Sequence, residues 1–265
     1  MRKLGFLGAG NMGSAIVKGI AKSELEVELF AYDKDTEKLV DLKKYGVKPC
    51  KSEAELAKKC GYILLAVKPQ VLGEVLDKLK GTVGENHVFI SICAGISSEF
   101  IKAHTCGGVR TAIVMPNTPA MLGVGASAVA RDEDISDEEF EFAKKVIGIC
   151  GLVREIPMDK MKEIICINGS SPAFIYLFAK GFVDYAENVG IDRKTALELF
   201  AQSLIGSANM LTDSGMTVDE LIKQVSSPGG TTLAGIDKLN EGKLTETVKE
   251  ACRACTKRAY ELAEK

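Results

Sequence analysis

Histidine is scarce in this chain of 265 residues, which contains His87 and His104 and no other. His87 precedes an apolar segment and His104 ends a predicted helix, so we expect both side chains to be structural or exposed. Most dehydrogenases that reduce a carbonyl group need a proton donor of tuned pKa beside the hydride site. The shortage of histidine therefore counts against that class of reaction.

Long apolar runs and a strong net charge are missing as well. No apolar run approaches the ~20 residues that span a bilayer. Too few apolar residues follow Met1-Arg2-Lys3 for a signal peptide. The net charge of -2 gives no electrostatic basis for binding nucleic acid. We expect a cytoplasmic protein that has neither a membrane nor a nucleic acid as partner.

Grouped metal ligands are also missing. The chain has eight cysteines, at positions 50, 60, 93, 106, 150, 166, 252 and 255. Cys252-x-x-Cys255 is the only closely spaced pair, and it lies in a predicted helix without a second pair or a histidine nearby. Zinc and redox sites need such additional ligands or a specific local fold. We expect free thiols and no metal site.

The first turn of the chain carries the clearest motif. An apolar segment of strand length leads into Gly8-Ala9-Gly10-Asn11-Met12-Gly13, and a helical pattern follows. Strand, Gly-x-Gly-x-x-Gly and helix in this order predict a dinucleotide site. Gly8 permits the tight turn, Gly10 lets a pyrophosphate approach the backbone, and Gly13 allows close packing of helix on strand. A glycine-rich turn without a ligand is the alternative.

An acidic residue follows at the expected distance. Asp33 lies about 20 residues beyond the last glycine, where such a side chain binds the adenosine ribose hydroxyls. This favours NADH. Lys34 could instead pair with a 2′-phosphate, which leaves NADPH open, and Asp33 could also simply cap the next helix.

Strands and helices alternate to about residue 155. Apolar segments at 27–32, 62–67, 88–92, 109–115 and 124–130 have strand length, and helical patterns lie between most of them. Pro69 suits a first helical turn, and Ser136-x-x-Glu139 is a capping box. This alternation predicts a doubly wound α/β sheet of Rossmann type, which we assign to residues 1–156.

The pattern then becomes helical, and we assign residues 157–265 to an all-helical domain. We expect Asp159 to cap a long helical segment with a break at Gly169–Pro172. Asp192 and Thr217-x-x-Glu220 should begin further helices. The first helix is apolar on more than one face, which burial in a homodimer or an enclosed central position would explain.

A second glycine-rich loop precedes another helix start. Ser227-Pro228-Gly229-Gly230-Thr231-Thr232 leads into a helical pattern, so several backbone N–H groups should point forward without partners. Such a helix start can bind an anion the size of one carboxylate, with Thr231 and Thr232 beside it. A capped turn between helices is the alternative.

Taken together, these motifs resemble pyrroline-5-carboxylate reductase, the last enzyme of proline synthesis. The resemblance covers nearly the whole chain in the expected order, and it rests on Gly8–Gly13, Ala66-Val67-Lys68-Pro69-Gln70, Met115-Pro116-Asn117-Thr118-Pro119 and Ser227–Thr232. The last two segments are the more specific. The resemblance implies reduction of the C=N bond of 1-pyrroline-5-carboxylate by NADPH or NADH, and a homodimer formed by the helical domain or a higher homo-oligomer.

The resemblance also implies the roles of individual residues. The cofactor-binding set is Gly8, Gly10, Asn11, Met12, Gly13, Asp33, Lys34, Ala66, Val67, Lys68, Pro69, Cys93, Ala94, Gly95, Met115 and Asn117. The substrate-binding set, which holds the carboxylate of a cyclic imino acid, is Ser227, Gly229, Gly230, Thr231 and Thr232. The Thr232 hydroxyl would also reach the ring nitrogen, which makes it the catalytic residue. A protonated imine accepts hydride readily, so no catalytic histidine is needed.

The sequence departs from the family pattern in three respects. Ile113 stands where many members carry arginine, and Ser171 stands where a glycine commonly precedes Pro172. Asp33-Lys34 replaces the small or basic residues of members that prefer NADP, which leaves the choice of cofactor open.

Two other functions share parts of this sequence pattern. β-Hydroxyacid dehydrogenases share this domain order but carry a catalytic lysine soon after a glycine-rich turn, with asparagine four residues later. Here the first lysine is Lys180, and Asp184 lies four residues on. A non-catalytic NAD(H) sensor would not need the loop at Ser227–Thr232.

Overall fold

A computed structural model describes residues 1–105 and 107–263; Cys106, one of the eight thiols, lies outside this range. The chain divides into two compact units, which we call unit 1 (Met1–Ser170 with Cys255–Lys265) and unit 2 (Ser171–Ala254). The domain boundary between residues 156 and 157 stays a prediction. Among the described residues, no helix is both long and apolar enough to cross a membrane.

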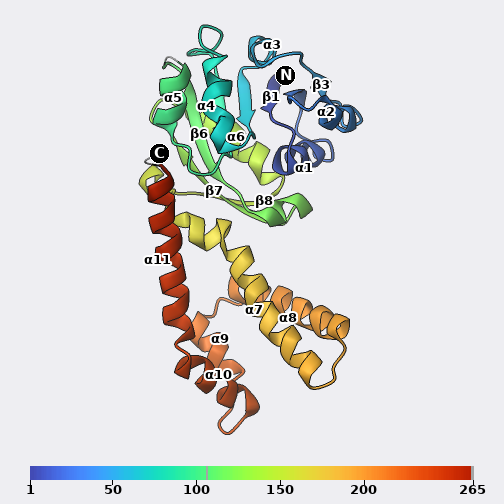
Figure 1. Cartoon of the computed structure of the whole chain (residues 1–265), viewed down its shortest axis with the longest axis vertical. Coiled ribbons are helices and arrows are strands. Elements are labelled where there is room, and N and C mark those ends of the chain that lie inside the picture. The colour runs from blue at the N-terminus through green and yellow to red at the C-terminus, as the bar shows by residue number, and fades with distance from the viewer. Residues whose placement is uncertain (106, 264–265) are drawn as a thin grey trace. The chain divides into compact units, whose positions relative to one another are not determined.

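Unit 1 is built on one sheet, which in the described chain has eight strands in the order β3-β2-β1-β4-β5-β6-β7-β8 (Figure 1). The strands are β1 (Arg2–Leu7), β2 (Val27–Tyr32), β3 (Lys48–Pro49), β4 (Tyr62–Leu65), β5 (Val88–Ser91), β6 (Arg110–Met115), β7 (Gly125–Arg131) and β8 (Gly151–Glu155). Neighbouring strands from β3 to β6 are parallel, whereas β7 is antiparallel to β6 and parallel to β8. The predicted doubly wound sheet is confirmed.

Helices cover both faces of this sheet. They are α1 (Asn11–Ile20), α2 (Thr36–Lys43), α3 (Glu53–Lys59), α4 (Pro69–Asp77), α5 (Ser98–Thr105) and α6 (Asp137–Gly148), with a 3₁₀ turn, η1 (Thr118–Leu122), between β6 and β7. One core packs α1, α2 and α6 on side chains such as Phe6 and Leu64. The other packs α3, α4 and α5 on Leu7 and Leu65. Because successive strand residues point to opposite faces, neighbouring residues enter different cores.

Two strands, β3 and β8, and one α-helix, α3, escaped prediction. β3 has two residues, too few for a periodic signal. β8 has no fully buried residue, so its sequence lacks the apolar run that marked the central strands. Short or half-exposed strands such as β3 and β8 form because a neighbouring strand offers them hydrogen bonds.

The segment after β8 corrects one expectation. Asp159 does not cap a long helix, because it lies inside a short 3₁₀ turn, η2 (Met158–Lys160). A π-helix, η3 (Ile165–Gly169), follows, and α7 (Ser171–Asn188) begins only after the predicted break. Pro172 is compatible with the first turn of α7, where its missing N–H removes no helical hydrogen bond.

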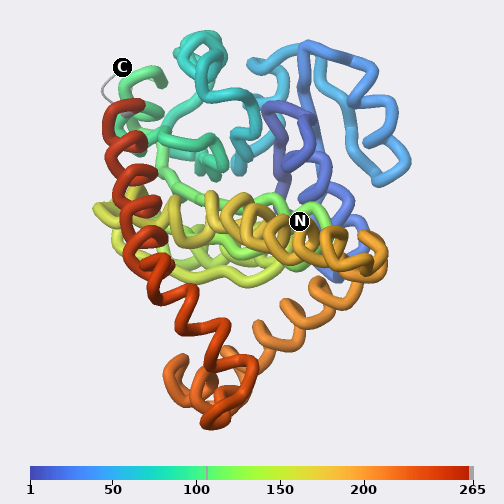
Figure 2. The backbone as a smooth tube through the Cα atoms, turned by 60° about the horizontal axis from the view of Figure 1, so that its bottom comes forward, coloured from blue at the N-terminus to red at the C-terminus, as the bar shows by residue number. Residues whose placement is uncertain are grey.

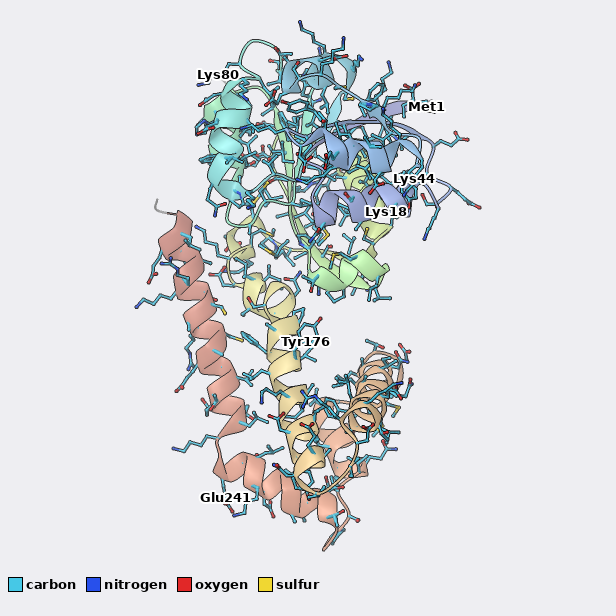
Figure 3. All side chains as sticks on the ribbon, turned by 45° about the vertical axis from the view of Figure 1, so that its right-hand side comes forward. Met1, Lys18, Lys44, Lys80, Tyr176 and Glu241 are labelled. Carbon is cyan, nitrogen blue, oxygen red and sulfur yellow. The ribbon has the colours of Figure 1, made fainter. Side chains whose placement is uncertain are left out.

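Unit 2 consists of helices. They are α7, α8 (Arg193–Asp213), α9 (Val218–Gln224), α10 (Thr231–Glu241) and the first part of α11 (Leu244–Ala263), which is drawn in red in Figure 2. The predicted caps are confirmed. Asp192 accepts a hydrogen bond from the Thr195 N–H at 2.8 Å, and Thr217 and Glu220 form a capping box. Glu241, labelled in Figure 3, ends α10 just before the turn into α11.

Candidate functional site

The predicted cofactor residues follow strands that end at one edge of the sheet. β1, β2, β4, β5 and β6 are parallel neighbours, so their carboxyl ends lie side by side. The order of strands along the chain reverses between β1 and β4. In open α/β sheets the crevice beyond the carboxyl ends at such a reversal binds ligands. The sequence therefore brings the predicted residues of unit 1 to one edge.

The three glycines after β1 have different physical reasons to be glycine. Gly8 has a φ of +102°, and a Cβ there would lie 2.6 Å from the carbonyl oxygen of Ala66. A Cβ on Gly13 would lie 2.8 Å from the carbonyl oxygen of Gly8. At Gly10, by contrast, no atom of the described residues lies within 4 Å of an added Cβ. The fold requires Gly8 and Gly13, whereas Gly10 leaves open space that a ligand can use.

The start of α1 has the properties of an anion site. Gly10 is the N-cap residue, and among the described residues no side chain caps this helix end. Asn11, Met12 and Gly13 form its first turn, where N–H groups have no partner within the helix. The positive end of the helix dipole adds to their attraction for phosphate. Together with the open space at Gly10, this arrangement fits a dinucleotide pyrophosphate.

A cavity of about 260 Å³ lies at this edge of the sheet. It is lined by predicted and unpredicted residues: Leu7, Gly8, Gly10, Tyr32, Asp33, Lys34, Lys38, Glu53, Ala66, Val67, Lys68, Val71 and Val75. Seven of the predicted cofactor residues thus share one cavity. Pro69, at the first position of α4, continues the loop that begins at Ala66.

Asp33 connects the end of β2 to the glycine-rich turn. Its Oδ2 accepts a hydrogen bond from the Ala9 N–H at 2.7 Å, and its Oδ1 accepts one from the Asp35 N–H at 2.9 Å. The N-cap of α2 is Asp35, so the alternative that Asp33 caps this helix is wrong. Asp33 is therefore a carboxylate with a fixed orientation on the cavity wall.

Two charged residues of the cavity were not predicted. Lys38 lies in the first turns of α2, with its Nζ 3.7 Å from Asp33 Oδ1 and 3.5 Å from Asp35 Oδ2. Glu53 has a side chain only 6% exposed, and its Oε1 accepts a hydrogen bond from Lys78 Nζ at 2.9 Å. The spacing of Lys38 from Asp35 was a usable signal for an ion pair. Nothing in the sequence around Glu53 pointed to the cavity.

Cys93, which follows β5, is buried in one of the two hydrophobic cores of unit 1. Its Sγ lies 3.4 Å from the carbonyl oxygen of Leu65 and 3.3 Å from that of Val67, both of which it can reach as donor. Burial raises the pKa of the Cys93 thiol to about 11. The thiol is thus a neutral group that ties the end of β5 to the loop after β4. Ala94 and Gly95, which follow, are exposed.

The turn after β6 is held by side-chain hydrogen bonds. Met115 ends β6 and is buried. Asn117 Oδ1 accepts a hydrogen bond from the Ala126 N–H at 2.9 Å. A residue that was not predicted, Asn168 of η3, donates from Nδ2 to the carbonyl oxygens of Met115 and Ala126.

The predicted substrate residues lie in unit 2. Gly230 is the N-cap of α10, and among the described residues no side chain caps that helix. A Cβ on Gly230 would lie 2.7 Å from Ser227 Oγ, and Gly229 has a φ of +71°. The positive φ favours glycine at position 229, and a side chain at position 230 would crowd Ser227. The loop presents the exposed Thr231 and Thr232 at a helix start suited to one anionic group.

The remaining candidates have structural partners. His87 Nε2 donates to the carbonyl oxygen of Ala57 at 3.1 Å, and His104 Nδ1 lies 3.0 Å from Asp77 Oδ1. Lys180 pairs with Asp184 on α7. No group of three or more potential metal ligands occurs among the residues that the structure describes.

Two family profiles match the sequence. Residues 158–262 match the profile described as pyrroline-5-carboxylate reductase dimerisation. Residues 3–95 match the one described as NADP oxidoreductase, coenzyme F420-dependent. The two matches fall on the helical and the sheet-forming parts of the chain, respectively.

Relatives and solved structures match the chain along its whole length. It is 34% identical to pyrroline-5-carboxylate reductase of Methanosarcina acetivorans, covering 100% of this chain and 99% of the relative. Identity to pyrroline-5-carboxylate reductase 2 of Bacillus subtilis is 32%, covering 100% and 96%. The Coxiella burnetii enzyme structure has a TM-score of 0.91 at 29% identity, covering 98% of both chains. The Plasmodium falciparum pyrroline carboxylate reductase, solved with NADP bound, has a TM-score of 0.87 at 29% identity, covering 99% and 98%. The chain belongs to the pyrroline-5-carboxylate reductase family.

Proposed function

We propose that this protein reduces the C=N bond of 1-pyrroline-5-carboxylate to give L-proline, the last step of proline biosynthesis, with NADPH or NADH as the hydride donor. The observation that carries the proposal is the full-length relationship to pyrroline-5-carboxylate reductases. Relatives of this kind do not favour a β-hydroxyacid dehydrogenase or a non-catalytic NAD(H) sensor. Each unit also offers a ligand site of the expected chemistry.

Unit 1 supplies the cofactor site. The first-turn N–H groups of α1, at Asn11–Gly13, hold the pyrophosphate, and Gly10 gives it room. The loops at Ala66–Pro69 and Cys93–Gly95, together with Met115 and Asn117, line the ribose and nicotinamide. When bound, the reduced nicotinamide supplies the hydride that adds to the imine carbon.

Unit 2 supplies the substrate site. The amides of Gly230 and Thr231, at the start of α10, hold the substrate carboxylate, with Ser227 and Gly229 shaping the loop. The Thr232 hydroxyl hydrogen-bonds the ring nitrogen. The carboxylate fixes the orientation of the ring, and orientation of both reactants can lower a barrier by about 7–11 kcal/mol at best.

The reaction fits a chain with few histidines. The nitrogen of a protonated imine already carries its proton, so hydride addition at carbon gives the amine of proline without a further acid. One neutral hydroxyl, that of Thr232, suffices to orient this nitrogen. His87 and His104 are bonded elsewhere in unit 1, which agrees with a mechanism that uses neither.

The choice between NADH and NADPH depends on the end of the cavity formed by β2. The fixed carboxylate of Asp33 suits ribose hydroxyls and repels a 2′-phosphate. Lys34 lines the same cavity and offers a positive charge. Both cofactors therefore belong to the proposal.

The assembly and the location are further parts of the proposal. The dimerisation profile over residues 158–262 supports homo-oligomerisation. We propose a homodimer formed by the helical domain, in the cytoplasm.

The decisive experiment follows the oxidation of NADH and NADPH, run separately, with 1-pyrroline-5-carboxylate as acceptor. We expect rapid turnover with at least one cofactor. 1-Pyrroline, which lacks the carboxylate, serves as the matched control and should react far more slowly. Measurable cofactor binding without turnover of the carboxylated imine would refute the reductase and favour the sensor.

A further inference from the structure

A buried asparagine follows an unusual stretch of backbone. Asn168 lies in η3, the π-helix Ile165–Gly169, and is only 8% exposed. π-Helices are rare in proteins, and those that occur often lie at functional sites. Burying an amide side chain is costly unless its groups find hydrogen-bond partners. The partners of Asn168 are therefore informative.

Asn168 bridges the ends of two strands. Its Nδ2 lies 2.6 Å from the carbonyl oxygen of Met115, at the end of β6, and 3.1 Å from that of Ala126, near the start of β7. One side-chain amide thus donates to the backbone of both strands. Next to it, Gly169 lies against Met115, whose Sδ would be 3.4 Å from an added Cβ.

These side-chain hydrogen bonds lie just beyond the end of the backbone pairing between β6 and β7. The antiparallel pairing of β6 with β7 ends with Met115 opposite Ala128. Two residues further along each strand, the side chain of Asn117 accepts a hydrogen bond from the Ala126 N–H. Ala126 is thus held by Asn117 through its N–H and by Asn168 through its carbonyl oxygen. Two asparagine side chains extend the strand pairing into the turn.

The position of this turn gives the arrangement its functional meaning. In a doubly wound sheet, the half that begins with β1 takes the adenosine part of a dinucleotide, and the second half takes the nicotinamide part. Met115 ends the last parallel strand of that second half. Its backbone therefore lies at the edge where the hydride must be aligned.

We propose that Asn168 is a positioning residue, which holds the Met115–Asn117 turn in the geometry needed for hydride transfer. The proposal rests on the reductase function proposed above. Asn168 acts through the backbone it binds and is not itself a catalytic residue. Misplacing a reacting group by about 1 Å can lower the rate about a hundredfold, so the loss of this clamp should reduce turnover strongly.

The test compares Asn168→Asp with Asn86→Asp. The first change keeps the size of the side chain, removes both donated hydrogen bonds and places a carboxylate against two carbonyl oxygens. Asn86 is exposed in the loop before β5, so the same chemical change there should have no effect. Asn168→Ala removes the donor without adding a charge, and it provides the comparison if the aspartate variant does not fold.

We expect kcat per folded site to fall about a hundredfold in both Asn168 variants. The primary deuterium isotope effect with 4-deuterated cofactor should rise, because hydride transfer becomes rate-limiting. The emission of bound NADPH should change while its Kd stays within about threefold, since most phosphate and adenosine contacts remain. The chain has no tryptophan, so energy transfer from tryptophan does not contribute to the emission of bound NADPH.

A purely structural role would lower the melting temperature and the folded fraction but leave the isotope effect and kcat per folded site unchanged. That result in Asn168→Ala would overturn the proposal. Absence of turnover in the unmodified enzyme would instead reject the reductase function. The NADPH emission of the Asn168 variants would then decide alone whether the clamp shapes the nicotinamide site.

Discussion

The two units of this chain treat their apolar side chains in opposite ways. In unit 1, large residues such as Phe89 and Phe140 are at most 1% exposed, and helices cover both faces of the sheet. In unit 2, Tyr176 and Leu177 of α7 are 63% and 71% exposed. Tyr176 is labelled in Figure 3. In the described chain, no side chain of α8, α9 or α10 is buried.

This contrast indicates that α7 of unit 2 carries apolar side chains that another protein surface would have to cover. Four consecutive apolar residues of α7, from Ile175 to Phe178, are exposed, and consecutive residues point about 100° apart around a helix. Contact along one side cannot bury all four of them. The sequence of α7 thus suits a helix that is surrounded in an assembly, as the dimerisation profile of this region indicates.

The largest expected effect tests this apolar surface. Leu177→Glu keeps helix propensity and places a charge where α7 should be buried between subunits. An unpaired buried charge costs several kcal/mol, so the dimer should weaken by at least about a hundredfold. Analytical ultracentrifugation over a concentration series measures the change.

Val40→Glu is the matched control, because Val40 of α2 is 62% exposed in unit 1, where the core is complete without it. The assembly of this variant should equal that of the unmodified protein. Equal dimerisation of the Leu177 variant would show that α7 is not at the subunit interface.

Much of this contrast was predictable from the sequence, because it depends on local patterns. The continuous apolar run at 62–67, closed by Lys68-Pro69-Gln70, is typical of a strand buried on both faces, and it contains β4. The change from strand–helix alternation to continuous helical patterns marks the start of the helical region. The glycine-rich turn was recognisable because Gly8, Gly10 and Gly13 lie in one short segment between a strand pattern and a helix pattern.

The contacts that shape the site were not predictable in the same way. Asp33 binds the Ala9 N–H, 24 residues away, and Asn168 binds the Met115 carbonyl oxygen, 53 residues away. Such bonds depend on which strands become neighbours in the sheet. The hydrophobic periodicity of the sequence carries no information about this strand order. Glu53 reaches the cavity through α3, an element that the sequence pattern did not reveal.

The second prediction concerns the chemistry of unit 2. Thr232→Ala should lower kcat about 10- to 100-fold, because a hydrogen bond to a charged group contributes about 1.5–3 kcal/mol. Thr232 is exposed, so the melting temperature should not change. Thr232→Ser keeps the hydroxyl and should retain most of the activity. An unchanged kcat in the alanine variant would remove Thr232 from the mechanism, and cofactor Kd, a property of unit 1, should be the same in all three proteins.

A smaller effect is expected at the cofactor site of unit 1. Gly10→Ala should leave the melting temperature unchanged, since no described atom lies within 4 Å of the new methyl group. Cofactor Kd should rise about tenfold, because the methyl group would occupy the space that we propose for the pyrophosphate. Gly8→Ala provides the contrast: its φ of +102° and the carbonyl oxygen of Ala66 should make it destabilising in the absence of any ligand. Unaltered NADPH binding by the Gly10 variant would place the pyrophosphate elsewhere.

The smallest effect tests a local helix cap in unit 2. Hydrogen bonds from the backbone N–H and then the hydroxyl of Thr195 lower the pKa of the Asp192 carboxyl. A lowered pKa in the folded state means that this stabilisation is fully present above the unfolded pKa and is lost as the pH falls through the folded value. Asp192→Asn should therefore lower the melting temperature slightly at pH 7, and the difference from the unmodified protein should shrink in acid. Asp237→Asn, inside α10, makes the same charge change away from a helix cap and is the matched control. The difference in melting temperature between Asp192→Asn and the unmodified protein could instead stay constant from neutral to acid pH. In that case the charge of Asp192 at the start of α8 would contribute nothing to the stability of unit 2.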